Sequence, residues 1–446
     1  MRAELPQSSA WLLFIGFVFG WTIVYSRGAY SEPALVFVFM ATLALMIRWS
    51  TQLKRKVEPE AATSLAPLVW VASICMAWFS WNDTEAIIYP MAPFTRARFG
   101  QAMGIVVLLT YVPFLTGRWK EHRFLRLGRF ALLAIALAIA GSGVIQSSPR
   151  PFIDVWTVQQ GGAEAMSNGR NPYTAVAVKD TGPRDAADVP YVYPPMQMFL
   201  TLPSYLLGGD VRFTMLASLL LAGFALRFIV QKSGRALPAV VEDGPALVIW
   251  TMPKLLFVLE QAWVDPVQVM LVCAAAAAVV TKRPILIAVA FGIVLTAKQT
   301  MFWTVGLAGI LLGFTRRQWV IVAGVGAASL IPFALADFKQ LKHSLLDFVS
   351  ALPDRPDALT FNIWLARKSG WMLPTALAFP FAAMVAGVSA WRMPRTLQHW
   401  ALATLATYTI FFVFNKWAFA NYYFTLGGLA ALAAAAATHE ATTEPA

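Results

Sequence analysis

The chain has 446 residues, of which 58% are hydrophobic and only 13% are charged. Soluble domains carry about a quarter charged residues, so this composition excludes an ordinary soluble fold and predicts a polytopic membrane protein. The net charge of +12 does not indicate nucleic-acid binding, because most Lys and Arg residues lie in short loops between apolar runs, where they set membrane topology.

Fifteen apolar runs follow one another along the chain. They lie near 11–25, 33–47, 65–81, 102–116, 130–146, 194–208, 211–230, 245–259, 266–281, 284–297, 300–314, 318–336, 371–391, 399–414 and 422–437. Apolar runs of this length cross membranes as helices and not as barrel strands, so we predict an all-α fold. Several runs are shorter than the ~20 residues of a perpendicular span, which predicts tilted or broken helices.

Basic residues between the runs indicate the orientation. If these loops are cytoplasmic, the N-terminus lies inside and successive runs cross the membrane in alternate directions. The alternation fails between 194 and 259, where an even number of crossings is required but three runs are present. The run at 194–208 is short and contains three prolines, so we expect it to be re-entrant. This leaves about 14 transmembrane helices, with both termini cytoplasmic, in the inner (plasma) membrane.

The chain divides into two parts. Residues 1–125 hold four runs and few polar features, and we predict an N-terminal four-span accessory module. Residues 126–446 hold the polar segments and are predicted to form the membrane core, with outer loops at 147–193 and 337–370 that carry amphipathic surface helices. The stretch 176–189 carries charges of both signs.

Five polar segments fall on the same, outer side in this topology. They are the loop that contains Asp154, the segment 260–265, the pair Lys298-Gln299, the loop 337–370 and the segment 415–421. A scaffold has no reason to gather acidic, basic and amide side chains on one face, whereas an active site does. We therefore expect these segments to form a site that faces the periplasm or the cell exterior.

Asp154 is the leading candidate for a catalytic base. It follows a predicted span and is flanked by Phe152, Ile153 and Trp156, and such a partly apolar setting suits a carboxylate to proton abstraction. An equally strong interpretation on spacing alone is that Asp154 caps the amphipathic stretch Val155–Met166 as a helix N-cap.

Other candidates lie in the remaining segments, and each also has a structural interpretation. Glu260 and Asp265 flank a Trp at a membrane boundary and suit hydrogen bonding to a polar ligand, although a simple interfacial turn has the same pattern. Lys298 interrupts an apolar stretch and suits an anionic leaving group, although a snorkelling lysine also fits. Arg355 suits a phosphate, although such residues often contact lipid headgroups.

Several of these motifs occur in a recognisable order. The chain contains Ile153-Asp154, then Gly169-Arg170-Asn171-Pro172-Tyr173, then Tyr193-Pro194-Pro195. This order resembles the first outer loop of GT-C superfamily membrane glycosyltransferases, and it is most similar to bacterial polyprenyl-phosphate-mannose-dependent mannosyltransferases and their uncharacterised relatives. The resemblance covers about 150–430 and includes Lys298-Gln299, Arg355-Pro356-Asp357 and the segment that ends in Asn421-Tyr422.

The resemblance implies a function and a set of site residues. The protein would transfer a sugar, such as the hexose mannose, from a polyprenyl-phosphate donor to a lipid or glycan acceptor in the cell envelope, by inverting displacement. Asp154 is the implied base, and the other implied residues fall into two groups. The sugar or acceptor group is Asn171, Tyr173, Tyr193, Glu260, Asp265, Asn421 and Tyr422, and the donor-phosphate group is Lys298, Gln299 and Arg355. No cofactor is required by this chemistry, and a divalent cation is compatible with it. The mixed-charge stretch 176–189 matches nothing in the family and is the predicted determinant of acceptor choice.

Three alternatives remain open at this point. A secondary transporter or flippase for lipid-linked glycans would place broken helices and polar groups near the middle of the membrane, often in two related halves. A scaffold would tolerate loss of Asp154. A ligase that moves a preassembled glycan would use the same groups as a monosaccharide transferase. We expect partners among lipids and glycans, and no nucleic acid.

Overall fold

The computed structural model describes residues 5–26, 29–53, 62–63, 123–151, 153–179, 188–234, 237 and 239–443. Within them the fold is almost entirely helical, in agreement with the predicted all-α class, and two antiparallel two-stranded pairs, β1–β2 and β3–β4, are the strands present. The predicted runs near 65–81 and 102–116 lie outside the described residues.

The elements run in the following order. The first are β1 (Leu5–Pro6), α1 (Gln7–Ser26), α2 (Glu32–Thr51), β2 (Ala62–Thr63), α5 (Arg123–Ser147), α6 (Asp154–Ser167), α7 (Pro172–Ala175), β3 (Ala177–Lys179), β4 (Asp188–Pro190), α8 (Pro195–Gly208), α9 (Arg212–Gln231), α10 (Ala239–Trp250) and α11 (Leu255–Glu260). They are followed by α12 (Asp265–Val280), α13 (Pro284–Leu295), η1 (Gln299–Met301), α14 (Phe302–Leu311), α15 (Arg316–Lys342), η2 (His343–Asp347), α16 (Phe348–Ala351), α17 (Phe361–Ser369), η3 (Thr375–Leu377), α18 (Ala378–Arg392), α19 (Leu397–Phe414) and α20 (Ala420–Thr443).

Seven helices of the described part are long and apolar enough to cross a membrane. They span 9–26, 32–51, 127–147, 212–231, 316–351, 375–392 and 397–414, and three shorter apolar helices lie at 265–280, 284–295 and 299–311. A multi-pass membrane protein follows from these helices, whereas the number fourteen stays a prediction. Part of the difference between seven long helices and fourteen expected spans comes from breaks in the helices. The chain is interrupted between α10 and α11 and between α13 and η1, which divides long apolar stretches into short helices.

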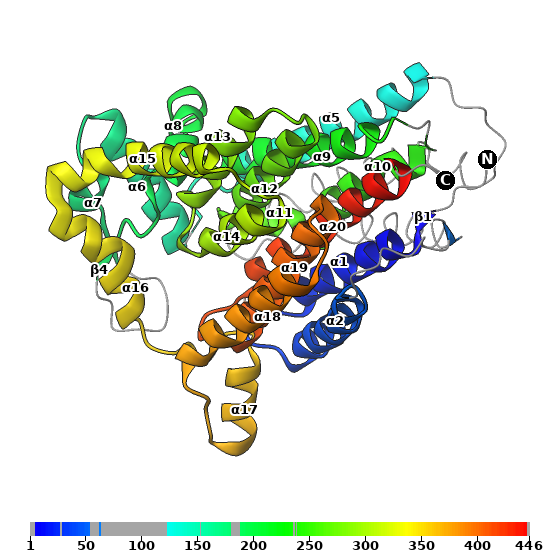
Figure 1. The fold of residues 1–446 in the computed structure, drawn as a ribbon. Helices are drawn as coiled ribbons and strands as arrows, with labels where there is room; N and C mark the ends of the chain where they lie inside the picture. The colour runs from blue at the N-terminus through cyan, green and yellow to red at the C-terminus, as the bar shows by residue number, and fades with distance from the viewer. Residues whose placement is uncertain are drawn as a thin grey trace.

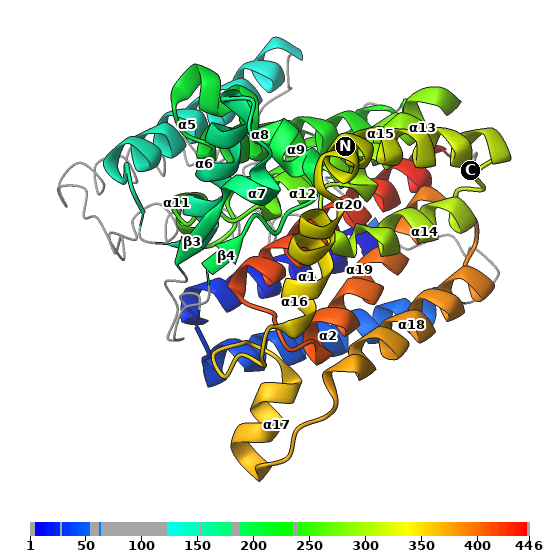
Figure 2. The same cartoon turned by 90° about the vertical axis from the view of Figure 1, so that its left-hand side faces the viewer.

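The molecule has two distinct ends (Figure 1). α1 begins and α20 ends at one of them, while α6, α7, β4 and α16 lie at the other, which we call the loop end. Figure 2 views the molecule from that side and shows β3, β4, α7 and α16 in front of the helix bundle. α8 has 14 residues and packs on α6. At ~1.5 Å per residue it is shorter than a perpendicular span, and the re-entrant course expected for this run stays a prediction.

Among the described helices, α1 and α20 make the most extensive contact. The α20 residues Ala430–Ala437 are buried, and such small side chains let helix backbones approach closely. The Ser9 hydroxyl lies 3.1 Å from the Ala434 carbonyl oxygen and 3.0 Å from the Thr438 hydroxyl. The helices α1 and α2 of the predicted accessory segment therefore share one hydrophobic core with α19 and α20. These two helices are an integral part of the bundle.

Gly223 allows α9 and α10 to pack. A Cβ atom at this position would lie 2.3 Å from Cε2 of the buried Trp250, whose indole nitrogen donates to the Leu219 carbonyl oxygen over 2.8 Å. We expect Gly223→Ala to lower the unfolding free energy by about 1–3 kcal/mol, the usual cost of overpacking. Gly324→Ala is the matched control, because a Cβ there meets nothing within 4 Å. Thermal unfolding in detergent compares the two, and equal midpoints would contradict the packing argument.

Candidate functional site

A cavity of about 320 Å³ lies among the elements of the loop end. All five polar segments singled out in the sequence contribute to its wall. The lining residues are Ile153, Asp154, Val155, Val189, Val192, Tyr193, Trp263, Val264, Lys298, Gln299, Phe348, Val349, Leu352, Arg355, Trp417, Phe419, Asn421 and Tyr422. Segments separated by more than two hundred residues in the chain thus meet in one place, as the predicted topology requires.

Asp154 stands at the start of α6 on the cavity wall. The N-cap of α6 is Ile153, in an extended conformation, and it makes no side-chain cap hydrogen bond. Asp154 is therefore the first helical residue and not the N-cap proposed as the structural alternative. Its Oδ1 accepts a hydrogen bond from the Val155 amide over 2.8 Å, and a carboxylate in the first turn also interacts favourably with the helix dipole.

Tyr193 lies beside Asp154 on the same wall. Burial raises the pKa of its hydroxyl above the usual value, and the negative charges of Asp154 and Asp265 raise this pKa further. The Tyr193 hydroxyl is a hydrogen-bond donor on the cavity wall.

Lys298 supplies a cation to the cavity. It occupies the break between α13 and η1, where its backbone is extended, and the break brings the side chain to the wall. Its ammonium nitrogen lies 3.5 Å from Oδ1 of Asp265 and 4.7 Å from the centre of the Tyr422 ring. With 12% of its side chain exposed, Lys298 is a nearly buried charge that is fixed in place by a carboxylate and an aromatic face.

Asp265 lies behind the cavity wall and is fully buried. Besides the ion pair with Lys298, it accepts a hydrogen bond from the Asn421 amide over 2.7 Å and from the Thr425 hydroxyl over 2.8 Å. The sequence predicted direct sugar contact for Asp265. The structure instead places it where it orients Lys298 and Asn421, both of which line the cavity.

Gln299 and Arg355 line the cavity, but both have protein partners. The Gln299 amide donates to the carbonyl oxygens of Val192 at 2.7 Å and Leu345 at 3.4 Å. The Arg355 guanidinium donates to both carboxylate oxygens of Asp357, at 2.8 and 2.7 Å. The Asp357 pair engages Nε and Nη2 of Arg355 and partly neutralises its charge, so a phosphate would bind a guanidinium that already has one anionic partner. Gln299 joins the segments that carry Val192 and Leu345.

Besides Asp265, three further predicted binding residues lie away from the cavity lining. Asn171 caps α7 by accepting a hydrogen bond from the Tyr173 amide over 3.1 Å. The buried Tyr173 donates its hydroxyl proton to the Tyr193 carbonyl oxygen over 2.8 Å. Glu260 is 2% exposed and ends α11. Asn171 and Tyr173 thus hold the loop in the structure, and the sugar contacts expected of all three residues stay predictions.

The sequence interpretation missed part of the wall. Trp417 and Phe419 line the cavity and place rings 5.9 and 5.0 Å from the Arg355 guanidinium carbon. Lys416 donates to the Leu352 carbonyl oxygen over 2.6 Å, and the Trp417 indole donates to that of Pro353 over 2.8 Å. The signal was present as alternating aromatic residues in 415–423, which also suits an interfacial belt.

Residues 180–187, which belong to the predicted determinant of acceptor choice, lie outside the described residues. Comparison of the chain with protein-family models, with curated proteins and with solved structures finds no match. The cavity and its charged side chains are therefore the basis for inferring a function.

Proposed function

We propose that the protein is a membrane glycosyltransferase that transfers a sugar from a polyprenyl-phosphate donor to a hydroxyl of a lipid or glycan acceptor. The observation that carries this proposal is the pairing, in one cavity, of a carboxylate at a helix start with a lysine held by a buried aspartate. A displacement at an anomeric carbon needs a base for the acceptor and a cation for the departing phosphate.

The reaction is a single in-line displacement. Asp154 takes the proton of the acceptor hydroxyl, whose oxygen forms a bond to the anomeric carbon on the side opposite the phosphate. The bond between that carbon and the phosphate oxygen breaks, and the polyprenyl phosphate leaves with the electron pair. Lys298 stabilises the negative charge that develops there. The anomeric configuration inverts, because one displacement occurs on one face.

The walls of the cavity suit a sugar with an attached phosphate. Ligand pockets range over about 300–1,000 Å³, and a volume of about 320 Å³ is at the small end of that range. It favours a donor with one sugar unit over a preassembled glycan. The rings of Tyr193, Trp417 and Tyr422 are aromatic surfaces against which the apolar face of a sugar can pack.

Membranes that contain the protein, supplied with radiolabelled polyprenyl-phospho-mannose, provide the test. We expect labelled product in these membranes and none in membranes without the protein, and we expect donors that carry a single sugar to react in preference to donors that carry an oligosaccharide. Polyprenyl-phospho-arabinose is the second donor in the same assay. If none of the lipid-linked donors is consumed, the proposed reaction is wrong.

A second candidate function is movement of a lipid-linked glycan across the membrane. The interrupted helices favour it, because transporters often bind substrate where helices are broken, and here α10–α11 and α13–η1 are interrupted. In liposomes that contain the purified protein, a transporter would move labelled donor between leaflets and leave it intact. A transferase would instead release polyprenyl phosphate from it.

A further inference from the structure

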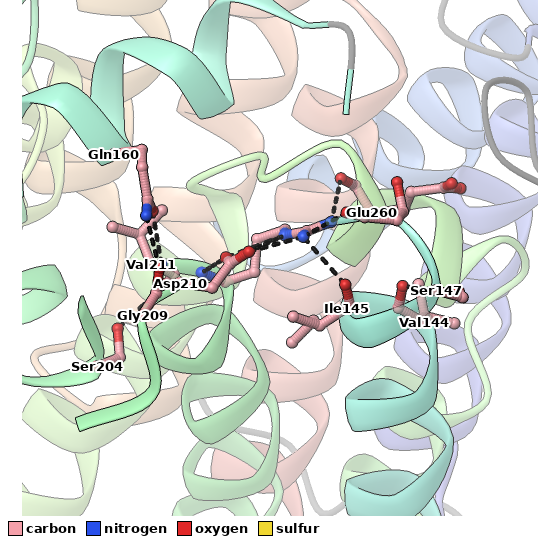
Figure 3. Close-up of polar contacts among 11 residues, drawn as sticks. Val144, Ile145, Ser147, Gln160, Ser204, Gly209, Asp210, Val211 and Glu260 are labelled. Atoms are coloured by element: carbon pink, nitrogen blue, oxygen red, sulfur yellow. Dashed lines mark hydrogen bonds and ion pairs between the residues drawn. The ribbon is translucent and has the colours of Figure 1, made fainter. Parts of the chain in front are cut away.

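A buried ion pair lies at the junction between α8 and α9 (Figure 3). Arg212 is fully buried, and its Nε lies 3.0 and 3.2 Å from the two carboxylate oxygens of Asp210, while its Nη2 lies 2.7 Å from Oδ2. The left-handed Gly209, at φ +72°, ends α8 and turns the chain into this pair. The pair lies outside the cavity lining and has no part in the displacement described above.

Arg212 links two segments of the chain. One leads to Asp154 and the other leads to Asp265, the partner of Lys298. Its Nη2 donates to the carbonyl oxygens of Ser148 at 2.6 Å and Ile145 at 3.2 Å, at the end of α5. Its Nη1 donates to the Glu260 carbonyl oxygen at 3.4 Å, at the end of α11. The chain continues from Ser148 to Asp154, and from Glu260 to Asp265, the partner of Lys298.

Gln160 provides a second attachment on α6. Its amide nitrogen donates to the Gly209 carbonyl oxygen over 2.6 Å, and its amide oxygen accepts from the Val211 amide over 3.1 Å. Figure 3 shows Gln160 on one side of Asp210 and Ile145 and Glu260 on the other. Ser148 and Gln160 lie six residues before and six residues after Asp154, so residues 209–212 hold the segment that carries Asp154 at both of its ends.

We propose that Arg212 is a positioning residue that sets the place of Asp154 relative to the Asp265–Lys298 pair. The kinetic part of this inference rests on the proposed function, whereas the structural part does not. An arginine is required because a planar guanidinium can bind the Asp210 carboxylate with one edge and carbonyl oxygens with its remaining donors. A lysine retains the charge and offers a single ammonium group, which cannot span the same partners.

Hydrogen–deuterium exchange of the purified full-length protein in lipid nanodiscs tests the structural part. We expect Arg212→Lys and Gln160→Leu to raise exchange at least severalfold in peptides that cover 148–160, and to leave peptides of α19 unchanged. Arg227→Lys is the matched control. It changes another nearly buried arginine of α9, which pairs with Asp243 and Glu242, but which lies fifteen residues further along the helix.

Kinetics separate positioning from a general loss of stability. With polyprenyl-phospho-mannose as donor, we expect Arg212→Lys to lower kcat by about 10²-fold, since small misplacements of reacting groups have effects of this size, with KM within threefold of the wild-type value. Arg227→Lys should retain both constants. If exchange in 148–160 is unchanged in folded Arg212→Lys and Gln160→Leu, the inference is wrong, whether or not a donor has been found. If no donor reacts, the proposed function fails and exchange alone decides this inference.

Discussion

Replacement of Asp154 by Asn is expected to lower the rate of sugar transfer by about 10²–10⁴-fold, the usual contribution of a general base. Asparagine has nearly the same shape, and its amide oxygen can accept the Val155 amide hydrogen bond that the carboxylate accepts now. Helix α6 should therefore start at the same residue, while the side chain loses its capacity to take a proton. Turnover of purified variants with saturating donor measures the effect.

Glu164 offers a control on the same helix. It is an exposed carboxylate, so Glu164→Gln removes one negative charge from α6 without a change in the cavity wall. Its turnover should stay within twofold of the wild type. Equal turnover of Asp154→Asn and the wild type would mean that Asp154 acts only through the helix start, and the catalytic assignment would then be abandoned.

Replacement of Lys298 by Met is expected to have two separate effects. Transfer should fall by about 10²–10³-fold, because one electrostatic contact to a developing charge contributes about that much. The protein should also lose about 3–5 kcal/mol of stability, because the buried Asp265 carboxylate would keep only its neutral donors Asn421 and Thr425. Steady-state turnover and thermal unfolding measure the two effects on the same preparation.

A double variant separates these effects. In Lys298→Met with Asp265→Asn, no unpaired charge is left behind, so most of the lost stability should return while transfer stays low. Lys342→Gln is the control for loss of a lysine, since Lys342 pairs with Asp347 at a half-exposed position outside the cavity lining. Recovery of transfer in the double variant would show that Lys298 serves only to neutralise Asp265.

The gathering of the five polar segments could be predicted from the sequence, and residues of all five line one cavity in the structure. The expectation came from apolar runs and basic loops, whereas the number of crossings that these imply stays a prediction. Asp154, Tyr193, Lys298, Arg355 and Tyr422 reach the cavity from segments that this argument had placed together. The start of α6 was predicted to within one residue, because the amphipathic pattern from Val155 is regular.

The direction of individual side chains could not be predicted in this way. Asp265 and Glu260 are five residues apart, but between them Ala262 adopts φ 53° and turns the chain between α11 and α12. The turn buries Asp265 behind Lys298 and leads Glu260 toward Arg212.

Asn171 and Tyr173 have side chains that suit a sugar, yet the same chemistry caps a short helix and anchors a loop. Composition does not distinguish these roles.

Arg212 shows a different limit of sequence reasoning. An Asp-x-Arg step between two apolar runs has the form of an ordinary charged loop. Arg212 links the segments because its guanidinium donates to the backbone carbonyl oxygens of Ile145, Ser148 and Glu260. Every residue has such an oxygen, so the sequence does not show which ones Arg212 will bind. Backbone partners leave no signature in the side-chain pattern, so the junction becomes visible only when the helices are placed in space.

A crystal or electron-microscopy structure with a bound donor analogue tests whether Lys298 holds the donor phosphate and Asp154 faces the sugar. The ligand would be a mannosyl phosphonate with a short prenyl chain, in which a carbon atom replaces the oxygen that joins the sugar to phosphorus. We expect the phosphonate to lie within about 3.5 Å of the Lys298 ammonium group, the distance of a charged hydrogen bond or ion pair. The anomeric carbon should face Asp154. A head group bound away from both residues, for example at the end where α1 begins, would contradict this expectation.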